Sequence, residues 1–124
     1  MAYIIKIPTY KDSKGSLTII EKILPFDIKR VYYIYNVGDP NIIRGGHRHK
    51  KNIQALICIN GKCIISNNDG VKKDKFTLDS PDKCLIIEKK DWHQMHSFTS
   101  NAILLVLASE YYEGNDYIEE KYDD

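Results

Sequence analysis

The chain has 124 residues, and its 18 Lys and Arg residues nearly balance 17 Asp and Glu residues, which leaves a formal net charge of +1. One domain spanning residues 1–124 is expected at this length, and such a domain can bury a core without disulfides or metal ions. The near-neutral balance argues against a nucleic-acid binder or a polybasic membrane binder. Only three of the basic residues are arginine, namely Arg30, Arg44 and Arg48.

Two features bear on where the protein works. The sequence has no apolar stretch of 18 residues, and its first residues, MAYIIKIPTY, lack the basic-then-apolar pattern of a secretory signal. Its three cysteines, Cys58, Cys63 and Cys84, form an odd set, which is typical of free thiols in a reducing compartment. We therefore expect a cytoplasmic protein with no membrane-spanning segment.

Short runs rich in Ile, Tyr and Val recur along the chain, and clusters of Gly, Pro, Asn and Asp separate them. The predicted strands, in chain order, are Tyr3–Ile7, Leu17–Lys22, Val31–Val37, Gly46–His49, Ile53–Ile59, Lys62–Asn67, Lys75–Leu78, Cys84–Glu88, Gln94–Phe98 and Ile103–Ala108. This spacing predicts an all-β sandwich or barrel. Residues Asp116–Tyr122 are predicted to form one short C-terminal helix or turn.

Two of these strands carry informative side-chain patterns. Alternation places Val31, Tyr33, Tyr35 and Val37 on one face of their strand. We predict that this is the inner face of a barrel that holds a polar ligand; the alternative is ordinary sheet packing with the hydroxyls at the rim. The run Ile103–Leu107 is continuously apolar, as expected of a strand buried on both faces.

The pair Asn60-Gly61 lies between two apolar runs and predicts a type I′ hairpin. A two-residue turn there would place Cys58 opposite Cys63. The two thiols would then be close enough to oxidise, or would simply pack as small core residues.

The segment from Arg44 to Lys51 holds two of the four histidines and no acidic residue. In an extended chain His47 and His49 project from the same face. His93 and His96 are three residues apart, so on a strand they point to opposite faces, and at most one of them joins the first pair. Two imidazoles among glycines and cations indicate a chemical site, with a solvated basic edge as the alternative.

The order of these residues resembles the first cupin motif, in which His-x-His is followed after four residues by Glu and after six more by Gly. The chain has His47-Arg48-His49, then Gln54 and Gly61 at those spacings, and His93 matches the histidine that ends the second motif. The resemblance implies a jelly-roll-like β-barrel. Glutamine stands where cupins carry a metal-binding glutamate, and it is a weaker ligand than a carboxylate.

A longer set of segments is more specific. In order along the chain they are Arg44–Lys50, Gln54–Leu56, Asp79–Lys83, Trp92–Met95, Leu107–Ser109 and Asp116–Ile118. Together they resemble the cupin sugar-nucleotide 3,4-ketoisomerases, which act on dTDP-4-keto-6-deoxyglucose. The resemblance implies metal-free, cofactor-free transfer of the carbonyl from C4 to C3 of the dTDP-linked 6-deoxyhexose. It also implies a product for an aminotransferase of surface-glycan synthesis, and a homodimer with exchanged N-terminal strands.

This reaction needs a base at C3, an acid at C4 and donors for the oxygen that gains charge, and imidazole serves the first two needs near neutral pH. We therefore expect His49 to be the proton shuttle, and His47 to be a second acid/base or an oxygen donor. Tyr35 is expected to donate to a sugar oxygen.

The remaining expected contacts are with the substrate. Arg44 is expected to bind phosphate or a sugar oxygen, since arginine suits phosphate. His93 is a candidate for the pocket wall, and Lys50 is a further substrate-binding candidate. In a regular strand Arg48 points away from the two histidines. It would therefore pair with an acidic side chain, or contact the nucleotide if the strand bulges.

Other functions remain open at this point. His47, His49 and His93 suit zinc, iron or copper, which would make the protein a metal-dependent cupin enzyme. The tyrosines and cations would also serve a sugar-nucleotide binding module without catalysis. A 3,5-epimerase would use a similar barrel and a similar substrate.

Overall fold

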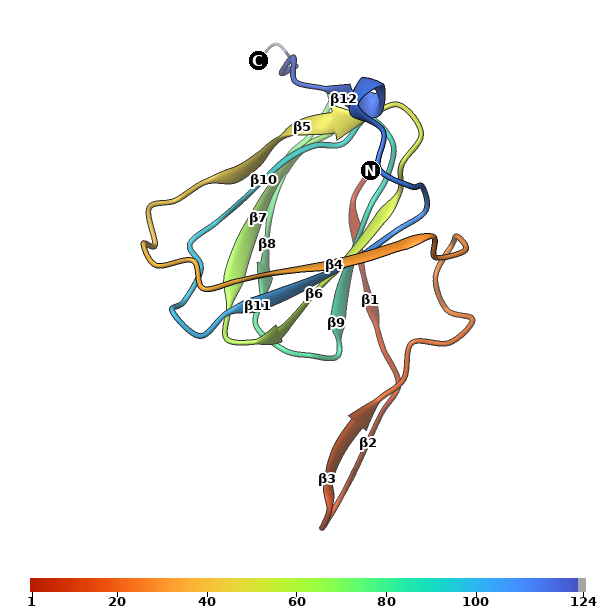
Figure 1. The fold of residues 1–124 in the computed structure, drawn as a ribbon, viewed down its shortest axis with the longest axis vertical. Helices are drawn as coiled ribbons and strands as arrows, with labels where there is room; N and C mark the ends of the chain where they lie inside the picture. The colour runs from red at the N-terminus through yellow and green to blue at the C-terminus, as the bar shows by residue number, and fades with distance from the viewer. Residues whose placement is uncertain (123–124) are drawn as a thin grey trace.

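A computed structural model describes residues 1–122 of the chain. Two five-stranded antiparallel sheets face each other, and a separate two-stranded hairpin extends away from them (Figure 1). The first sheet contains, in spatial order, β1 (Tyr3–Lys6), β9 (Lys83–Ile87), β6 (Gln54–Asn60), β11 (Ile103–Ala108) and β4 (Arg30–Tyr35). The second contains β12 (Tyr117–Ile118), β5 (Arg44–His49), β10 (Trp92–His96), β7 (Cys63–Asn68) and β8 (Lys73–Leu78). The all-β, jelly-roll-like prediction is confirmed.

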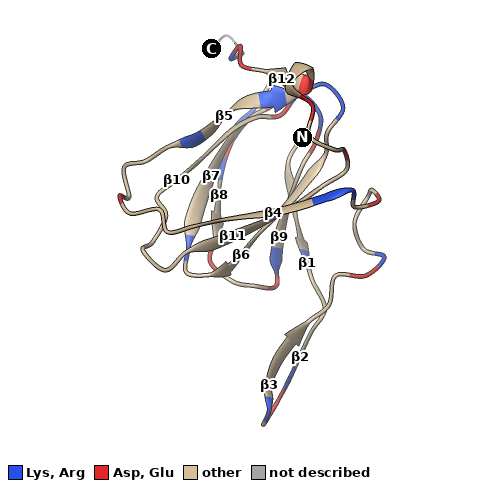
Figure 2. Cartoon of the chain, viewed as in Figure 1, with Lys and Arg blue, Asp and Glu red and all other residues tan. Residues whose placement is uncertain are grey.

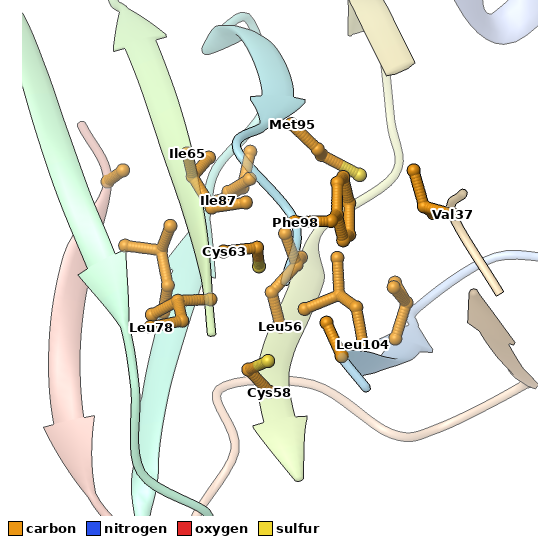
Figure 3. Close-up of a cluster of buried hydrophobic side chains, with 14 residues drawn as sticks. Val37, Leu56, Cys58, Cys63, Ile65, Leu78, Ile87, Met95, Phe98 and Leu104 are labelled. Carbon is orange, nitrogen blue, oxygen red and sulfur yellow. The ribbon is translucent and has the colours of Figure 1, made fainter. Parts of the chain in front are cut away.

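The main core fills the space between the two sheets. Inward-pointing side chains of alternate residues meet there, and Figure 3 shows Leu56 and Leu104 of the first sheet near Ile65 and Met95 of the second, with Phe98 between them. Each such side chain is almost fully buried, and burial of one Leu or Ile contributes about 1.5–3 kcal/mol to folding. The core therefore holds the two sheets at the spacing on which the site depends.

A second apolar cluster covers the outer face of the first sheet. Ile57 and Leu107 point to this side, where residues Ile20, Ile23 and Phe26 from the long connection after β3 pack against them. Strand β11 is thus buried on both faces, as its continuous apolar run predicts, with Leu104 and Val106 in the main core.

The N-terminal hairpin was predicted only in part. It consists of β2 (Thr9–Asp12) and β3 (Gly15–Thr18), whereas the sequence pattern places one strand at Leu17–Lys22. The hairpin projects from the body of the molecule, and Tyr10 and Leu17 on it are largely exposed (Figure 1).

Two local predictions need correction. The C-terminal segment contains a turn, as one form of the prediction had it, but residues Asp116–Tyr122 do not form a helix. A 3-10 turn at Gly114–Asp116 leads into β12, because Tyr117 and Ile118 pair with the edge of β5. The Asn60-Gly61 turn does not close a type I′ hairpin, since only Gly61 of the two has a positive φ, at +69°. The chain instead passes from the first sheet to the second there, so β6 and β7 pair with other strands.

The thiols on either side of this corner still meet. Cys58 and Cys63 are both buried and free, and their thiols hydrogen-bond with each other, which raises the pKa of Cys63. Their oxidation stays a prediction.

The basic and acidic residues are distributed differently. Lysine and arginine residues occur on strands of both sheets, whereas most acidic residues lie in the connections between strands (Figure 2). No helix within residues 1–122 has the length and apolar character to cross a bilayer.

Candidate active site

Three of the four histidines gather on the inner side of the second sheet. Strands β5 and β10 are antiparallel neighbours, and their register sets His47 opposite His93. The ring of His47 lies 5.0 Å from that of His49 and 5.1 Å from that of His93, centroid to centroid. His96 points to the other side, where its Nε2 bonds Ser66 Oγ at 2.7 Å. One histidine of the later pair joins the first two, which agrees with the predicted alternation.

Asp116 orients His49. The Nδ1–H of His49 donates to Asp116 Oδ2 over 2.9 Å, and both side chains are largely buried. The same carboxylate accepts the backbone N–H groups of Lys51 at 2.8 Å and Asn52 at 3.4 Å. Strand β12 brings Asp116 here, because Tyr117 pairs with His49 in the sheet register. The carboxylate therefore keeps the proton on Nδ1, and the lone pair on Nε2.

The Nε2 atom of His49 is buried, and within residues 1–122 it has no hydrogen-bond partner. The Nε2 atom of His93 is in the same situation, while its Nδ1 lies 3.1 Å from the backbone oxygen of Asp91. A buried polar atom without a partner is costly and is common at functional sites. Both atoms suit contact with a bound substrate.

Burial keeps the three imidazoles neutral at pH 7. It lowers the pKa of His47 to about 4 and that of His93 to about 3. Burial also lowers the pKa of His49, where the adjacent Asp116 opposes the shift and the charge of Arg30 adds to it. A neutral imidazole with an oriented lone pair is available as a proton acceptor without prior loss of a proton.

Three residues of the first sheet and its neighbourhood border the cluster. Gln54 is buried and donates through Nε2 to the hydroxyl of Tyr32 at 3.0 Å, while its Oε1 has no partner in the described part of the chain. The guanidinium of Arg30 lies 4.6 Å from the centre of the Tyr32 ring. Gln54, at the position of the cupin glutamate, thus holds a phenol in place.

Aromatic rings from the C-terminal segment lie beside the histidines. The ring of Tyr117 is 4.6 Å from those of both His47 and His49, in edge-to-face orientations. Tyr112 lies 5.8 Å from Tyr117 and 5.3 Å from the guanidinium of Arg30. These contacts limit the motion of both imidazoles and place a cation at the edge of the cluster.

Three other residues predicted to bind substrate, Arg44, Lys50 and Arg48, differ in how they are placed relative to the histidine cluster. Arg44 is exposed at the start of β5, and its charge acts on the hydroxyl of Tyr32, whose pKa burial raises and Arg44 lowers. Lys50 is exposed just after β5, and its backbone N–H donates to the backbone oxygen of Asp116 at 2.9 Å. Arg48 points away from the histidines, with its guanidinium 3.9 Å from the ring centre of Tyr122, and no acidic residue among residues 1–122 forms a salt bridge with it.

The predicted inner face of β4 is wrong for three of its four residues. Val31, Tyr33 and Tyr35 are 55%, 61% and 56% exposed on the outer side of the first sheet. The face is reversed because Tyr32 and Ile34 pack against the main core, and a one-residue change of register exchanges the two faces of a strand. Tyr35 therefore lies outside the histidine cluster of its own chain, and its catalytic role stays a prediction.

Four residues of the cluster had no assigned role from sequence: Arg30, Tyr32, Asp116 and Tyr117. A signal existed for two of them, because Asp116-Tyr117-Ile118 belongs to the motif set that carries the family resemblance. Nothing in the sequence links Asp116 to His49, since the two are 67 positions apart. Only the pairing of β12 with β5 joins them.

The arrangement does not favour a metal centre. Across residues 1–122, no three His, Cys, Asp or Glu side chains converge as ligands of one ion. The Nδ1–H of His49 already donates to Asp116. The position at which cupins carry a metal-binding glutamate holds Gln54, whose amide donates to the Tyr32 hydroxyl. The side chains suit proton transfer between a bound molecule and a buried imidazole.

Comparison with known proteins agrees with this chemistry. The chain is 48% identical over 109 residues, 86% of its length and 78% of the relative's, to a TDP-4-oxo-6-deoxy-alpha-D-glucose-3,4-oxoisomerase of Aneurinibacillus thermoaerophilus. A mutant 3,4-ketoisomerase, QdtA of Thermoanaerobacterium thermosaccharolyticum, solved with TDP-4-keto-6-deoxyglucose, superposes with a TM-score of 0.91 at 45% identity, over 96% of this chain and 87% of that one.

The fold extends beyond these isomerases. The dTDP-4-dehydrorhamnose 3,5-epimerase of Bacillus anthracis superposes with a TM-score of 0.80 over 94% of this chain and 76% of that one, but at 16% identity, which shows a shared fold alone. The family model described as "FdtA: WxcM-like, C-terminal" matches residues 1–124. Taken with the 48% identity to the oxoisomerase, this match shows that the chain belongs to the FdtA family of WxcM-like C-terminal domains.

Proposed function

We propose that the protein is a sugar-nucleotide 3,4-ketoisomerase that converts dTDP-4-keto-6-deoxyglucose into a dTDP-3-keto-6-deoxyhexose. The observation that carries the proposal is the buried His49–Asp116 pair, whose Nε2 atom is unpartnered within the described chain. The relatives named above supply the substrate class. Metal and cofactor play no part in the proposed steps.

The reaction moves one carbon-bound proton and one hydroxyl proton. Nε2 of neutral His49 removes the proton from C3, the electrons of that bond form a C3–C4 double bond, and the C4 oxygen becomes an enolate. The proton of the C3 hydroxyl then passes to the C4 oxygen, and C4 takes up a proton from the imidazolium. The C3 oxygen is left as the new carbonyl, so atoms and electrons balance.

Neighbouring groups support the charges of this path. Asp116 stabilises the imidazolium that forms on His49, because the hydrogen bond to a carboxylate strengthens when the ring is charged. His47, 5.0 Å away ring to ring, serves as the second acid/base that carries the hydroxyl proton between the two oxygens. We assign oxygen donation to the Tyr32 hydroxyl, because Tyr32 lies on the inner face of β4 and Tyr35 does not.

The diphosphate requires cations, and arginine binds phosphate with paired N–H donors. Arg44 and Arg30 are the two arginines whose charges act on groups of the cluster, namely Tyr32 and His49. Lys50, whose backbone N–H bonds the backbone oxygen of Asp116, is a further substrate-binding residue, and His93 forms part of the pocket wall. Arg48 would meet substrate only after leaving Tyr122.

We further propose a homodimer with exchanged N-terminal strands. The projecting hairpin exposes Tyr10 and Leu17, and the outer face of the edge strand β4 exposes Val31, Tyr33 and Tyr35. Apolar side chains on an open sheet edge favour association. Sedimentation equilibrium should give a dimer for the full chain and a monomer after Tyr33→Glu with Tyr35→Glu. A monomeric full chain would contradict the exchange.

The proposed setting is the cytoplasm, where Cys58, Cys63 and Cys84 remain reduced. A 3-keto sugar is the carbonyl compound that a transaminase needs to install a 3-amino group. The product would accordingly enter the synthesis of an amino sugar for a surface glycan.

The test is conversion of dTDP-4-keto-6-deoxyglucose, followed by NMR in deuterated water with EDTA present. A 3,4-ketoisomerase forms the 3-keto product, with deuterium at C4 to the extent that the imidazolium exchanges with solvent before it protonates C4. Deuterium at C5 would instead indicate epimerase chemistry, and binding of dTDP without turnover would indicate a binding module. Absence of turnover by folded protein would refute the proposal.

A further inference from the structure

A second hollow lies on the outer face of the second sheet, on the opposite side of β10 from the histidines. Its volume is about 290 Å³, close to the lower end of the range for small-molecule sites. Outward-pointing residues of three strands and the C-terminal segment line it, namely Ser66, Asn68, Lys75, Trp92, Gln94 and Lys121, together with their neighbours. The mechanism above uses none of these six side chains.

A glycine on the neighbouring strand helps to keep this hollow open. On the adjacent strand β5, a Cβ atom at Gly46 would lie 3.9 Å from both Trp92 Cζ2 and Gln94 Nε2. Gly46 therefore leaves the flank of β10 uncovered. The indole ring of Trp92 is fixed by a hydrogen bond, because its Nε1–H donates to the backbone oxygen of Glu119 at 3.2 Å.

The lining is positively charged. Lys73, Lys75 and Lys121 contribute to it. Among residues 1–122, Asp74 is the one acidic residue of the lining, and it pairs with Lys72, outside the lining, at 3.7 Å. The ammonium of Lys121 lies 5.2 Å from the ring centre of Trp92. The charge of Lys75 on β8 also acts across the sheet on His96 of β10, whose pKa is lowered first by burial and then by this charge.

We propose that this hollow binds a small phosphorylated ligand, with its phosphate oxygens between the ammonium groups of Lys75 and Lys121. Ammonium groups bind phosphate as point charges. The carboxamides of Asn68 and Gln94 and the hydroxyl of Ser66 add hydrogen-bonding groups, and the lysine stems and Trp92 give an apolar floor. The inference does not depend on the isomerase activity, because binding is measured without turnover.

The chain offers a direct reporter, since Trp92 is its only tryptophan. We expect inorganic pyrophosphate, titrated at low ionic strength, to shift the Trp92 indole N–H and the Gln94 carboxamide resonances in a saturable way. Thymidine, which has no phosphate, should shift neither. Substitution of both Lys75→Gln and Lys121→Gln should weaken pyrophosphate binding by about tenfold, as expected for the loss of two exposed charges. Lys62→Gln, in the turn between β6 and β7, is the matched control.

Three results would overturn the proposal. The first is the lack of a saturable shift at Trp92 and Gln94. The second is equal affinity in the double variant and the control, with both spectra showing folded protein. The third is a shift confined to the rings of His47 and His49, which would place the anion in the active site alone.

Discussion

The sharpest test of the proposed mechanism is Asp116→Asn, because it removes one charge and keeps the size of the side chain. Asp116 Oδ1 accepts the N–H of Lys51 at 2.8 Å, so the carbonyl of the new amide keeps that position. Its NH2 group then faces Nδ1 of His49, where Oδ2 now lies at 2.9 Å. Two donors cannot share a hydrogen bond, so Nδ1 becomes the acceptor and the ring proton moves to Nε2.

The loss of rate has two parts. A hydrogen bond to a charged group contributes about 1.5–3 kcal/mol, which is a factor of about 10 to 100 if it acts on the imidazolium. The changed tautomer adds to this, because a protonated Nε2 has no lone pair for the C3 proton. We expect kcat to fall by about 10²- to 10⁴-fold, a range that resembles the effect of the same exchange in the serine-protease triad.

The pH profile separates this role from simple damage to the fold. Asp116 raises the pKa of His49, so its neutral replacement lowers that pKa. Activity requires the unprotonated ring, and the acid limb of kcat/KM should therefore move to lower pH. Melting temperature and dTDP affinity serve as controls. If kcat stays within about threefold of the parent, or the acid limb does not move, Asp116 does not act through His49.

Three further outcomes are expected. His49→Asn should reduce turnover by about 10²- to 10⁴-fold in the NMR assay while the dTDP affinity measured by calorimetry changes little, and retained turnover would remove His49 from the base role. Burial lowers the pKa of His93 to about 3 from an ordinary value near 6.5, so its contribution to stability is complete above pH 6.5 and is lost as the pH falls toward 3. Urea unfolding should show about 2 kcal/mol less stability at pH 5 than at pH 7 from this residue, and a His93→Gln variant with the same loss would contradict the linkage. Gly61→Ala should destabilise the fold by about 2 kcal/mol or more, since φ is +69° and the new Cβ would lie 2.8 Å from Ala102 Cα, whereas Gly38→Ala meets no atom within 4 Å and should change the melting temperature little; equal effects would refute the steric argument.

Local patterns predicted most of the sheets. Ile103–Ala108 coincides with β11, and the other predicted runs overlap strands of the structure, because strand propensity and turn residues act over a few positions. The misses were β2 and β12. Strand β12 is only Tyr117–Ile118, and it exists because the edge of β5 offers hydrogen bonds to it. No local pattern contains that partner.

The choice of face was harder to predict than the strand itself. In β4 the alternation was correct, but which set faces inward depends on the opposite sheet. Tyr32 faces inward, where its hydroxyl oxygen accepts a hydrogen bond from Gln54 Nε2, and Tyr33 and Tyr35 face outward. A strand with aromatic residues on both faces does not reveal this choice by itself.

The sequence by itself determined the fold class, the family resemblance and the pairing of His47 with His49, since a spacing of two on an extended chain puts both rings on one side. It also limited the later histidines to one participant. The resemblance pointed to His93 as this participant, and in the structure its ring lies beside that of His47. The tertiary structure decided that Asp116 holds His49 and that Arg30 and Tyr32 border the cluster. These contacts join residues far apart in the chain through sheet register, and register depends on the whole packed core rather than on any one segment.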